Sequence, residues 1–219
     1  MANETVDEFG VSAARIEAAT LLRRLGHAIV GHHIDDGQLL ALTAAVTPFV
    51  EQMEADPPRF RAESGRDGAS HFQAPPEDGA VLEHFPDCIV SGKANPMGVA
   101  IVVHREGDQA VATVTLGPAF EGAPERSHGG IVAAIFDDVM GYLLSIVGEP
   151  AFTGQLTVNY RAPTPMRQEL TFRAWVTGRE GRKLFIGADA RHDGDLVADA
   201  AGLFVTIPME RFLEATGRA

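Results

Sequence analysis

The sequence predicts an α+β fold, in which an antiparallel sheet of about six strands wraps around one central helix, with a helical extension at the N-terminus. Two observations support this prediction. After Pro86, six segments have the composition and patterning of β-strands. A single helical segment, residues 129–147, follows the second of them and is apolar on nearly every side, so it must be buried. A curved antiparallel sheet around this helix is the simplest architecture that buries it.

The length of 219 residues suits one domain with an extension. A change from a helical to a mostly strand-like pattern divides the chain into residues 1–84 and 85–219. Apolar residues recur at steps of three and four over residues 11–53, which predicts a helical hairpin with Asp36 as the N-cap of its second helix. Residues 55–85 show no period and contain four prolines, so we expect a Pro-rich linker there.

The second part, residues 85–219, is predicted to hold the whole sheet and its central helix. Turn-like sequences such as HDGD separate the last strands and favour tight antiparallel connections. A short amphipathic segment, residues 209–215, closes the chain. The expected strands cover residues 98–104, 110–116, 153–161, 169–177, 183–191 and 196–207.

The composition excludes several classes of function. There are 18 Lys and Arg against 30 Asp and Glu, a net charge of −12, which argues against broad binding to nucleic acid or to an anionic membrane. Cys88 is the only cysteine, so a disulfide framework within the chain and a multi-cysteine metal site are impossible. The start of the sequence lacks a signal-peptide pattern, and the apolar runs are too short for a membrane span. We therefore expect a cytoplasmic protein without a metal, a nucleic-acid partner or a membrane segment.

The most informative stretch is residues 120–141, FEGAPERSHGGIVAAIFDDVMG. His128, Gly129 and Gly130 lie at the start of the central helix, where glycines let a ligand approach backbone N–H groups and the helix dipole favours negative charge. The same apolar helix carries Asp137 and Asp138 in its middle. Carboxylates are rarely buried without a partner or a function, so this helix is the predicted functional element.

The spacing of small residues on this helix predicts a second copy of the chain. Gly130, Ala134, Asp137 and Gly141 follow at steps of four, three and four, which puts them on one stripe where another helix can come close. Gly129 and Asp137 are separated by roughly 12 Å along a helix axis, so a single helix cannot present both to one carbonyl group. Two antiparallel helices in a homodimer can.

Residues 120–141, together with LTVNYRAPTP at residues 156–165, resemble the hot-dog-fold thioesterases, specifically the PaaI-like branch and its subgroup of mammalian acyl-CoA thioesterases with long N-terminal extensions. The resemblance spans about residues 87–207 and leaves out the N-terminal helices. It implies an acyl-CoA thioesterase that hydrolyses a coenzyme A thioester to the free acid and CoA. It also implies a homodimer or homotetramer with the active site at the subunit interface, and no cofactor, because coenzyme A is part of the substrate.

The resemblance assigns roles to individual residues. It implies that Asp137 is the general base or nucleophile and that the Gly129 backbone N–H forms the oxyanion hole. His128 shapes the turn or polarises the thioester carbonyl, and Thr153 orients the attacking water. The residues expected to contact the substrate are Gly130, Gly122, Arg126 and Arg161, of which the arginines suit the phosphates of coenzyme A.

One position departs from the family pattern. Several members carry Asn or Gln six positions before the histidine of the His-Gly-Gly motif, and this chain has Gly122 there. The departure motivates an alternative, a hot-dog protein that binds acyl-CoA or another apolar ligand without turning it over. An enoyl-CoA hydratase or dehydratase and a non-enzymatic assembly module, with Asp137 purely structural, are further alternatives.

Simpler roles are open for most of the candidate residues. Asp138 competes with Asp137 for the catalytic role, although we expect it to be solvated or paired with an arginine. Cys88 is expected to be a small core residue. His128 also suits a turn residue bonded to the backbone, and Thr153 also suits an ordinary strand position.

Overall fold

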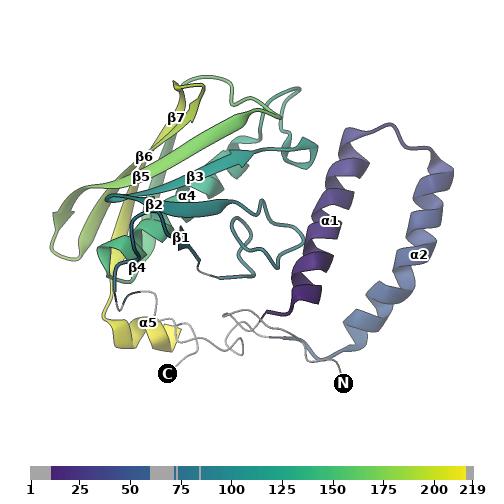
Figure 1. The fold of residues 1–219 in the computed structure, drawn as a ribbon, viewed down its shortest axis with the longest axis horizontal. Coiled ribbons are helices and arrows are strands. Elements are labelled where there is room, and N and C mark those ends of the chain that lie inside the picture. Colours follow the sequence, from purple (N-terminus) through teal and green to yellow (C-terminus); the bar gives the residue numbers. More distant parts are fainter. Residues whose placement is uncertain (1–10, 60–71, 73, 84, 216–219) are drawn as a thin grey trace.

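The computed structural model describes residues 11–59, 72, 74–83 and 85–215 (Figure 1). Seven antiparallel strands form one sheet in the order β1-β2-β3-β5-β6-β7-β4, and the sheet curves over helix α4 (Figure 1). The predicted architecture, a sheet wrapped around one central helix, is confirmed. The strands are β1 (Val81–Leu82), β2 (Val102–Glu106), β3 (Gln109–Thr115), β4 (Ala151–Tyr160), β5 (Glu169–Glu180), β6 (Lys183–His192) and β7 (Asp195–Thr206).

Helix α4 (Gly129–Val147) has the bounds predicted from its apolar run. His128 caps its start and Gly148, at φ 77°, ends it in the left-handed conformation that glycine adopts readily. By length and composition alone this helix passes for a membrane span, but its inner side is buried against the sheet, as expected for a core helix. Its largest fully buried side chains are Ile135, Phe136, Met140 and Leu143.

The sheet buries one face against α4 through a period of two. In β5, Leu170, Phe172 and Ala174 point inward while the residues between them are more exposed. The Phe136 and Phe172 rings pack edge to face at 5.1 Å, which joins α4 to the centre of the sheet. These inward rows are the reason that the segment from β5 to β7 folds as a meander over the helix.

Two details of the sheet differ from the prediction. The two-residue strand β1 pairs with β2 and lies before residue 85, where the sequence led us to expect only linker. The strand expected over residues 98–104 begins at Val102, because Ala100 has a φ of 60° and its N–H turns back to bond Val90 O at 2.6 Å. A residue with that φ cannot continue an extended strand.

The N-terminal helices are α1 (Ala13–Gly31) and α2 (Asp36–Ala55), joined by a short connection. Asp35, not Asp36, caps α2: its side chain accepts from the Gln38 N–H. Residues 60–71, 73 and 84 of the expected Pro-rich linker lie outside the described residues.

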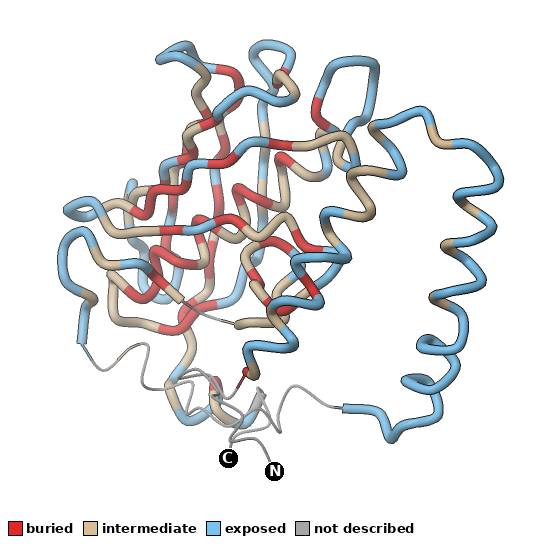
Figure 2. Tube along the Cα trace, turned by 45° about the vertical axis from the view of Figure 1, so that its right-hand side comes forward, coloured by how far each residue is buried: buried red, intermediate tan, exposed pale blue. Residues whose placement is uncertain are grey.

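Helix α1 packs against the rest of the fold, whereas α2 is the outermost element of the molecule. The His27 ring packs edge to face on Phe120 of the short 3-10 helix η2 (Pro118–Phe120), and His27 Nδ1 accepts from the Ala119 N–H at 3.1 Å. Helix α2 has no buried residue, and Figure 2 shows it exposed along its length with α1 between it and the sheet. Helix α5 (Met209–Ala215) follows the sheet and lies below it in Figure 1.

Candidate functional site

Asp137 and Thr153 form a direct side-chain pair. The Thr153 hydroxyl donates to Asp137 Oδ1 at 2.8 Å, joining the middle of α4 to the start of β4. The register of β4 against β7 shifts between Thr153 and Gln155, which marks a bulge at Gly154. A bulge re-aims the side chains beside it, and glycine suits such a position. Two residues predicted to act together are thus in contact, and one oxygen of the carboxylate is held in a fixed orientation.

A largely apolar cavity of about 320 Å³ opens beside this pair. Asp137 and Thr153 both line it. A carboxylate next to an apolar cavity of this size is the arrangement expected where a polar reacting group and an apolar tail bind together. The other lining side chains come from α4, β4, β7, α5 and the segment before β2: Phe72, Phe85, Cys88, Ser91, Asp138, Gly141, Leu144, Ala151, Phe152, Phe204 and Phe212.

The start of α4 presents a backbone donor. His128 Nδ1 accepts from the Gly130 N–H at 2.9 Å, so the imidazole acts as the helix cap. The Gly129 N–H donates to no acceptor within the described part of the chain, and the helix dipole adds partial positive charge there. His128 therefore shapes the turn at the start of α4. The other role considered for it, polarising the thioester carbonyl, stays a prediction.

Tyr160 is a residue of this region that the sequence analysis missed. Its hydroxyl donates to the Gly129 carbonyl at 2.6 Å and so fixes the first turn of α4 against the end of β4. A Cβ atom on residue 129 would lie 3.1 Å from that hydroxyl, a tight contact that a small shift of the Tyr160 ring would relieve. The signal was present, because Tyr160 stands inside the LTVNYRAPTP segment that carried the family resemblance.

The two halves of the predicted site are not brought together within one chain. Gly129 and Asp137 lie at the first turn and in the middle of one straight helix, roughly 12 Å apart along its axis at the helical rise per residue. Strand β4, beside them, is the terminal strand of the sheet and most of its side chains are exposed. Both the separation and the open strand edge leave room for a second copy of the chain.

Gly122 has a packing reason to be glycine. A Cβ atom there would lie 2.9 Å from His128 Cα, closer than side chains approach backbone in real structures. The turn is tight because the Gly122 N–H bonds Arg126 O at 2.9 Å and the His128 N–H bonds Phe120 O at 2.9 Å. The position where the family resemblance leads us to expect Asn or Gln therefore has no space for a side chain here.

Asp138 differs from its predicted environment. Among the described residues of the single chain it has no arginine partner, and a pairing with an arginine of a second chain stays a prediction. Its side chain lines the cavity and is partly buried, and the Cys88 thiol donates to its Oδ1 at 3.2 Å. Burial raises the pKa of Asp138 above its ordinary value, the charge of Asp137 raises it further, and Ser91 and Cys88 oppose the shift. Within the described residues, Asp138 Oδ2 and Ser91 Oγ are buried without a hydrogen bond of ordinary geometry. Cys88 packs against the core as expected, but its contact with Asp138 was not foreseen.

The two candidate phosphate-binding arginines lie near the start of α4. Arg126 is exposed two residues before the cap His128, and its backbone pairs with Pro165. Arg161 directly follows Tyr160 and its guanidinium pairs with Asp199. Because the Arg161 guanidinium already pairs with the Asp199 carboxylate, Arg126 is the better placed of the two arginines to bind a phosphate.

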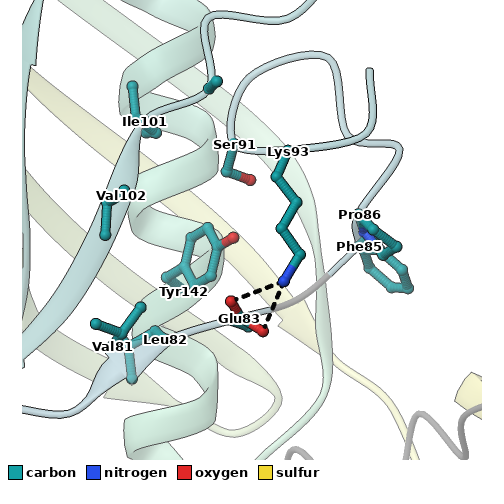
Figure 3. A pocket seen from close by; sticks show the side chains of 11 residues that line it. Val81, Leu82, Glu83, Phe85, Pro86, Ser91, Lys93, Ile101, Val102 and Tyr142 are labelled. Atoms are coloured by element: carbon teal, nitrogen blue, oxygen red, sulfur yellow. Dashed lines mark hydrogen bonds and ion pairs between the residues drawn. The ribbon is translucent and has the colours of Figure 1, made fainter. Parts of the chain in front are cut away.

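Figure 3 shows a second, smaller cavity of about 100 Å³. Phe85 and Ser91 line both cavities, so they form the wall between them. Lys93 Nζ donates to Glu83 Oε1 at 3.1 Å in the lining of this cavity, and Tyr142 of α4 also lines it (Figure 3). No group of three or more His, Cys, Asp or Glu within the described ranges is arranged to hold a metal ion.

Comparison with known proteins agrees with this fold. The family model of the thioesterase superfamily matches residues 127–198. The acyl-coenzyme A thioesterase THEM4 of Bos taurus is 30% identical over 125 residues, which is 55% of this chain and 51% of that protein. THEM5 of Mus musculus is 28% identical over 112 residues, 50% of this chain and 45% of that protein. The chain thus spans about half the length of the curated relatives it matches.

A solved structure extends the likeness in fold to most of the chain. The crystal structure of a thioesterase superfamily protein, 23% identical in sequence, has a TM-score of 0.73 and covers 91% of this chain and 92% of its own. The TM-score and the coverage establish a shared fold. The chain has the hot-dog fold, and its residues 127–198 match the family model of the thioesterase superfamily.

Proposed function

We propose that this chain is an acyl-CoA thioesterase of the PaaI-like branch, which hydrolyses a coenzyme A thioester to a free acid and CoA. The observation that carries the proposal is the Asp137–Thr153 pair at an apolar cavity. The matched relatives THEM4 and THEM5 bear the name acyl-coenzyme A thioesterase, which supports this class of substrate.

The chemistry follows from the two halves of the site. Asp137 removes a proton from a water molecule while the water oxygen forms a bond to the thioester carbonyl carbon. The carbonyl oxygen becomes negative next to a Gly129 N–H, which a helix start stabilises. The carbon–sulfur bond then breaks, CoA leaves as a thiolate that takes up the proton, and the free acid remains. In the nucleophilic version, the Asp137 carboxylate attacks the carbonyl carbon, and the carbon–sulfur bond breaks as CoA leaves as a thiolate. Water then hydrolyses the resulting anhydride, which releases the free acid and restores the Asp137 carboxylate, and the thiolate takes up a proton from that water.

The active unit is a homodimer in which Asp137 of one subunit faces the Gly129 N–H of the other. The separation of these groups along α4 supports this arrangement, as does the long exposed edge strand β4. An unpaired strand edge is a template for pairing with a second chain. Antiparallel packing of two α4 helices brings one helix start beside the middle of the other. Two such dimers stacked together would give the homotetramer.

The substrate is oriented by charge at one end and by apolar surface at the other. Arg126 supplies a cation near the start of α4 for the phosphates of coenzyme A, and the acyl group enters the cavity beside Asp137. Every step described is carried out by side chains, backbone and water. No cofactor is therefore proposed beyond the coenzyme A of the substrate.

A thiol-release assay tests the proposal. Wild type, Asp137→Ala and Asp137→Asn are compared on acetyl, medium-chain, long-chain and aryl esters of coenzyme A. We expect wild type to release thiol with a preference for certain acyl groups, and both variants to lose at least about 100-fold in kcat, because a general base contributes roughly that much. Wild-type rates in Asp137→Asn would refute the role of this carboxylate.

Gly122 favours one other function, binding without turnover. Since no side chain fits at that position, the site lacks the second polar group that relatives bring to the carbonyl. If no ester in the panel is hydrolysed while coenzyme A esters raise the melting temperature of the wild type, the chain is a ligand-binding protein and the enzyme proposal is wrong.

A further inference from the structure

One wall of the cavity beside Asp137 is an aromatic side chain from the terminal helix, outside the sheet and the central helix. Phe212 lies on α5, is only 7% exposed and lines the cavity. Its ring packs edge to face on Phe72 at 5.4 Å and lies 6.1 Å from the ring of Phe152. Helix α5 therefore contributes to this wall with a large, rigid group.

The size of the cavity limits what it can hold. A cavity of 150 Å³ in another protein binds benzene, so the cavity of about 320 Å³ here has roughly twice the volume that a benzene ring needs. Part of it must take the thioester carbonyl and the attacking water beside Asp137. The remaining volume suits an aryl acyl group or an alkyl chain of medium length, whereas a long, extended chain would have to reach beyond the cavity.

Extension into the neighbouring cavity is blocked. That cavity holds about 100 Å³, which is smaller than the space that benzene needs, and Phe85 and Ser91 separate it from the first. The walls from α4, β4 and β7 belong to the packed fold, and Phe72 and Phe85 line the cavity from the chain before β2. Phe212 is the large wall residue that belongs to a separate terminal helix.

We propose that Phe212 is a specificity-determining residue, which sets the upper size limit of the acyl group, and that the preferred substrate carries an apolar acyl group of medium length or with one aromatic ring. The proposal rests on the proposed function, since it takes this cavity as the acyl site of the thioesterase reaction. One methylene beyond the limit of an apolar pocket costs on the order of tenfold to 200-fold in kcat/KM, so a single wall residue is sufficient to define a length limit.

The test compares wild type with Phe212→Ala and Phe212→Trp. Phe185→Ala is the matched control, because Phe185 lies on β6 outside both cavities and is partly exposed. For each protein, kcat/KM is measured over a series of saturated acyl-CoA esters of increasing length and for arylacetyl-CoA. Dissociation constants are measured by calorimetry for the matching thioethers of coenzyme A, which cannot be hydrolysed.

We expect the wild-type profile to peak at medium length. Phe212→Ala should move the limit to longer chains, with at least about a tenfold gain in the ratio of long-chain to medium-chain kcat/KM, and Phe212→Trp should move it to shorter chains. Phe185→Ala should follow wild type. Unchanged length profiles in both Phe212 variants, with hydrolysis intact, would overturn the assignment of Phe212. Absence of hydrolysis with a length shift in thioether binding would refute the proposed reaction and leave the assignment of the acyl cavity supported; absence of both hydrolysis and a length shift would overturn both.

Discussion

Replacing Gly141 by alanine separates the behaviour of one chain from that of the proposed dimer. Gly141 lies inside α4, on the stripe of small residues, and a Cβ atom built on it meets no atom within 4 Å. In a single chain the substitution should stabilise the helix by about 0.8–1 kcal/mol, because glycine is the poorer helix former by that amount. For a protein of this size that corresponds to roughly 2–4 °C in melting temperature.

In the antiparallel α4 dimer the same methyl group enters a close contact. Overpacking of such a contact costs about 1–3 kcal/mol, which would weaken dimerisation roughly 5- to 150-fold. Gly26 is the matched control, since it also lies inside a helix, α1, and its Cβ likewise meets nothing within 4 Å. Gly26→Ala should raise stability by a similar amount and leave dimerisation unchanged.

The assay is sedimentation equilibrium over a dilution series, with thermal unfolding at the same concentrations because the stability of a dimer depends on concentration. We expect a higher dissociation constant for Gly141→Ala alone, with a fall in specific activity on dilution. A variant that dimerises as tightly as wild type and gains the full helix stabilisation would refute a close helix contact at Gly141.

Three further outcomes are expected. Thr153→Val should lower kcat by about 10- to 100-fold, since a hydrogen bond to a charged group contributes about 1.5–3 kcal/mol, whereas Thr153→Ser should keep most activity; equal rates for valine and wild type would contradict the pairing with Asp137. Burial raises the pKa of Asp138, so its contribution to stability is fully present below the unfolded pKa of 3.8 and is lost as the pH rises through the folded pKa. Denaturant titrations should therefore show the free energy of unfolding of Asp138→Asn rising relative to that of wild type from pH 4 upward. A difference in free energy that does not change with pH would exclude the pKa shift. Gly122→Ala should lose about 1–3 kcal/mol of stability, together with activity, because its methyl group meets His128 Cα at 2.9 Å; an unchanged denaturation midpoint would contradict that contact.

The elements with strong local signals were predictable. Helix α4 was predicted to the residue because a largely apolar run, interrupted by Asp137 and Asp138, lies between His128 and Gly148. The β6–β7 turn was predictable from its Asp-Gly pair, and Asp193 and Gly194 both have positive φ in the structure. The contact between Asp137 and Thr153 joins two predicted site residues, although their catalytic roles stay predictions.

The features that were missed depend on contacts between distant parts of the chain. The environment of Asp138 is set by Cys88, 50 positions earlier, and no local pattern reports such a contact. Phe212 reaches the cavity only because the chain after β7 turns back beneath the sheet. The two residues of β1 are too few to show a period. The positive φ of Ala100 could not be predicted, because that conformation is usually signalled by a glycine and here the residue is alanine.

The central claim, a site shared between two subunits, is most directly tested by mixing two inactive variants. Asp137→Ala removes the base. Gly129→Pro removes the N–H donor and should preserve the helix, because proline is favoured at the first helical position and the ψ of 127° at His128 suits a following proline. Gly129→Ala is the control, since it places the same Cβ near Tyr160 but keeps the N–H.

Thiol release is measured for each variant alone and for an equimolar mixture after subunit exchange. Each mixed dimer regains one intact site, with Asp137 from one chain and the Gly129 N–H from the other. Since half of the dimers are mixed, the account predicts recovery to about a quarter of the wild-type rate. A mixture that stays as inactive as its components, although mixed dimers form, would contradict a site built across the subunit interface.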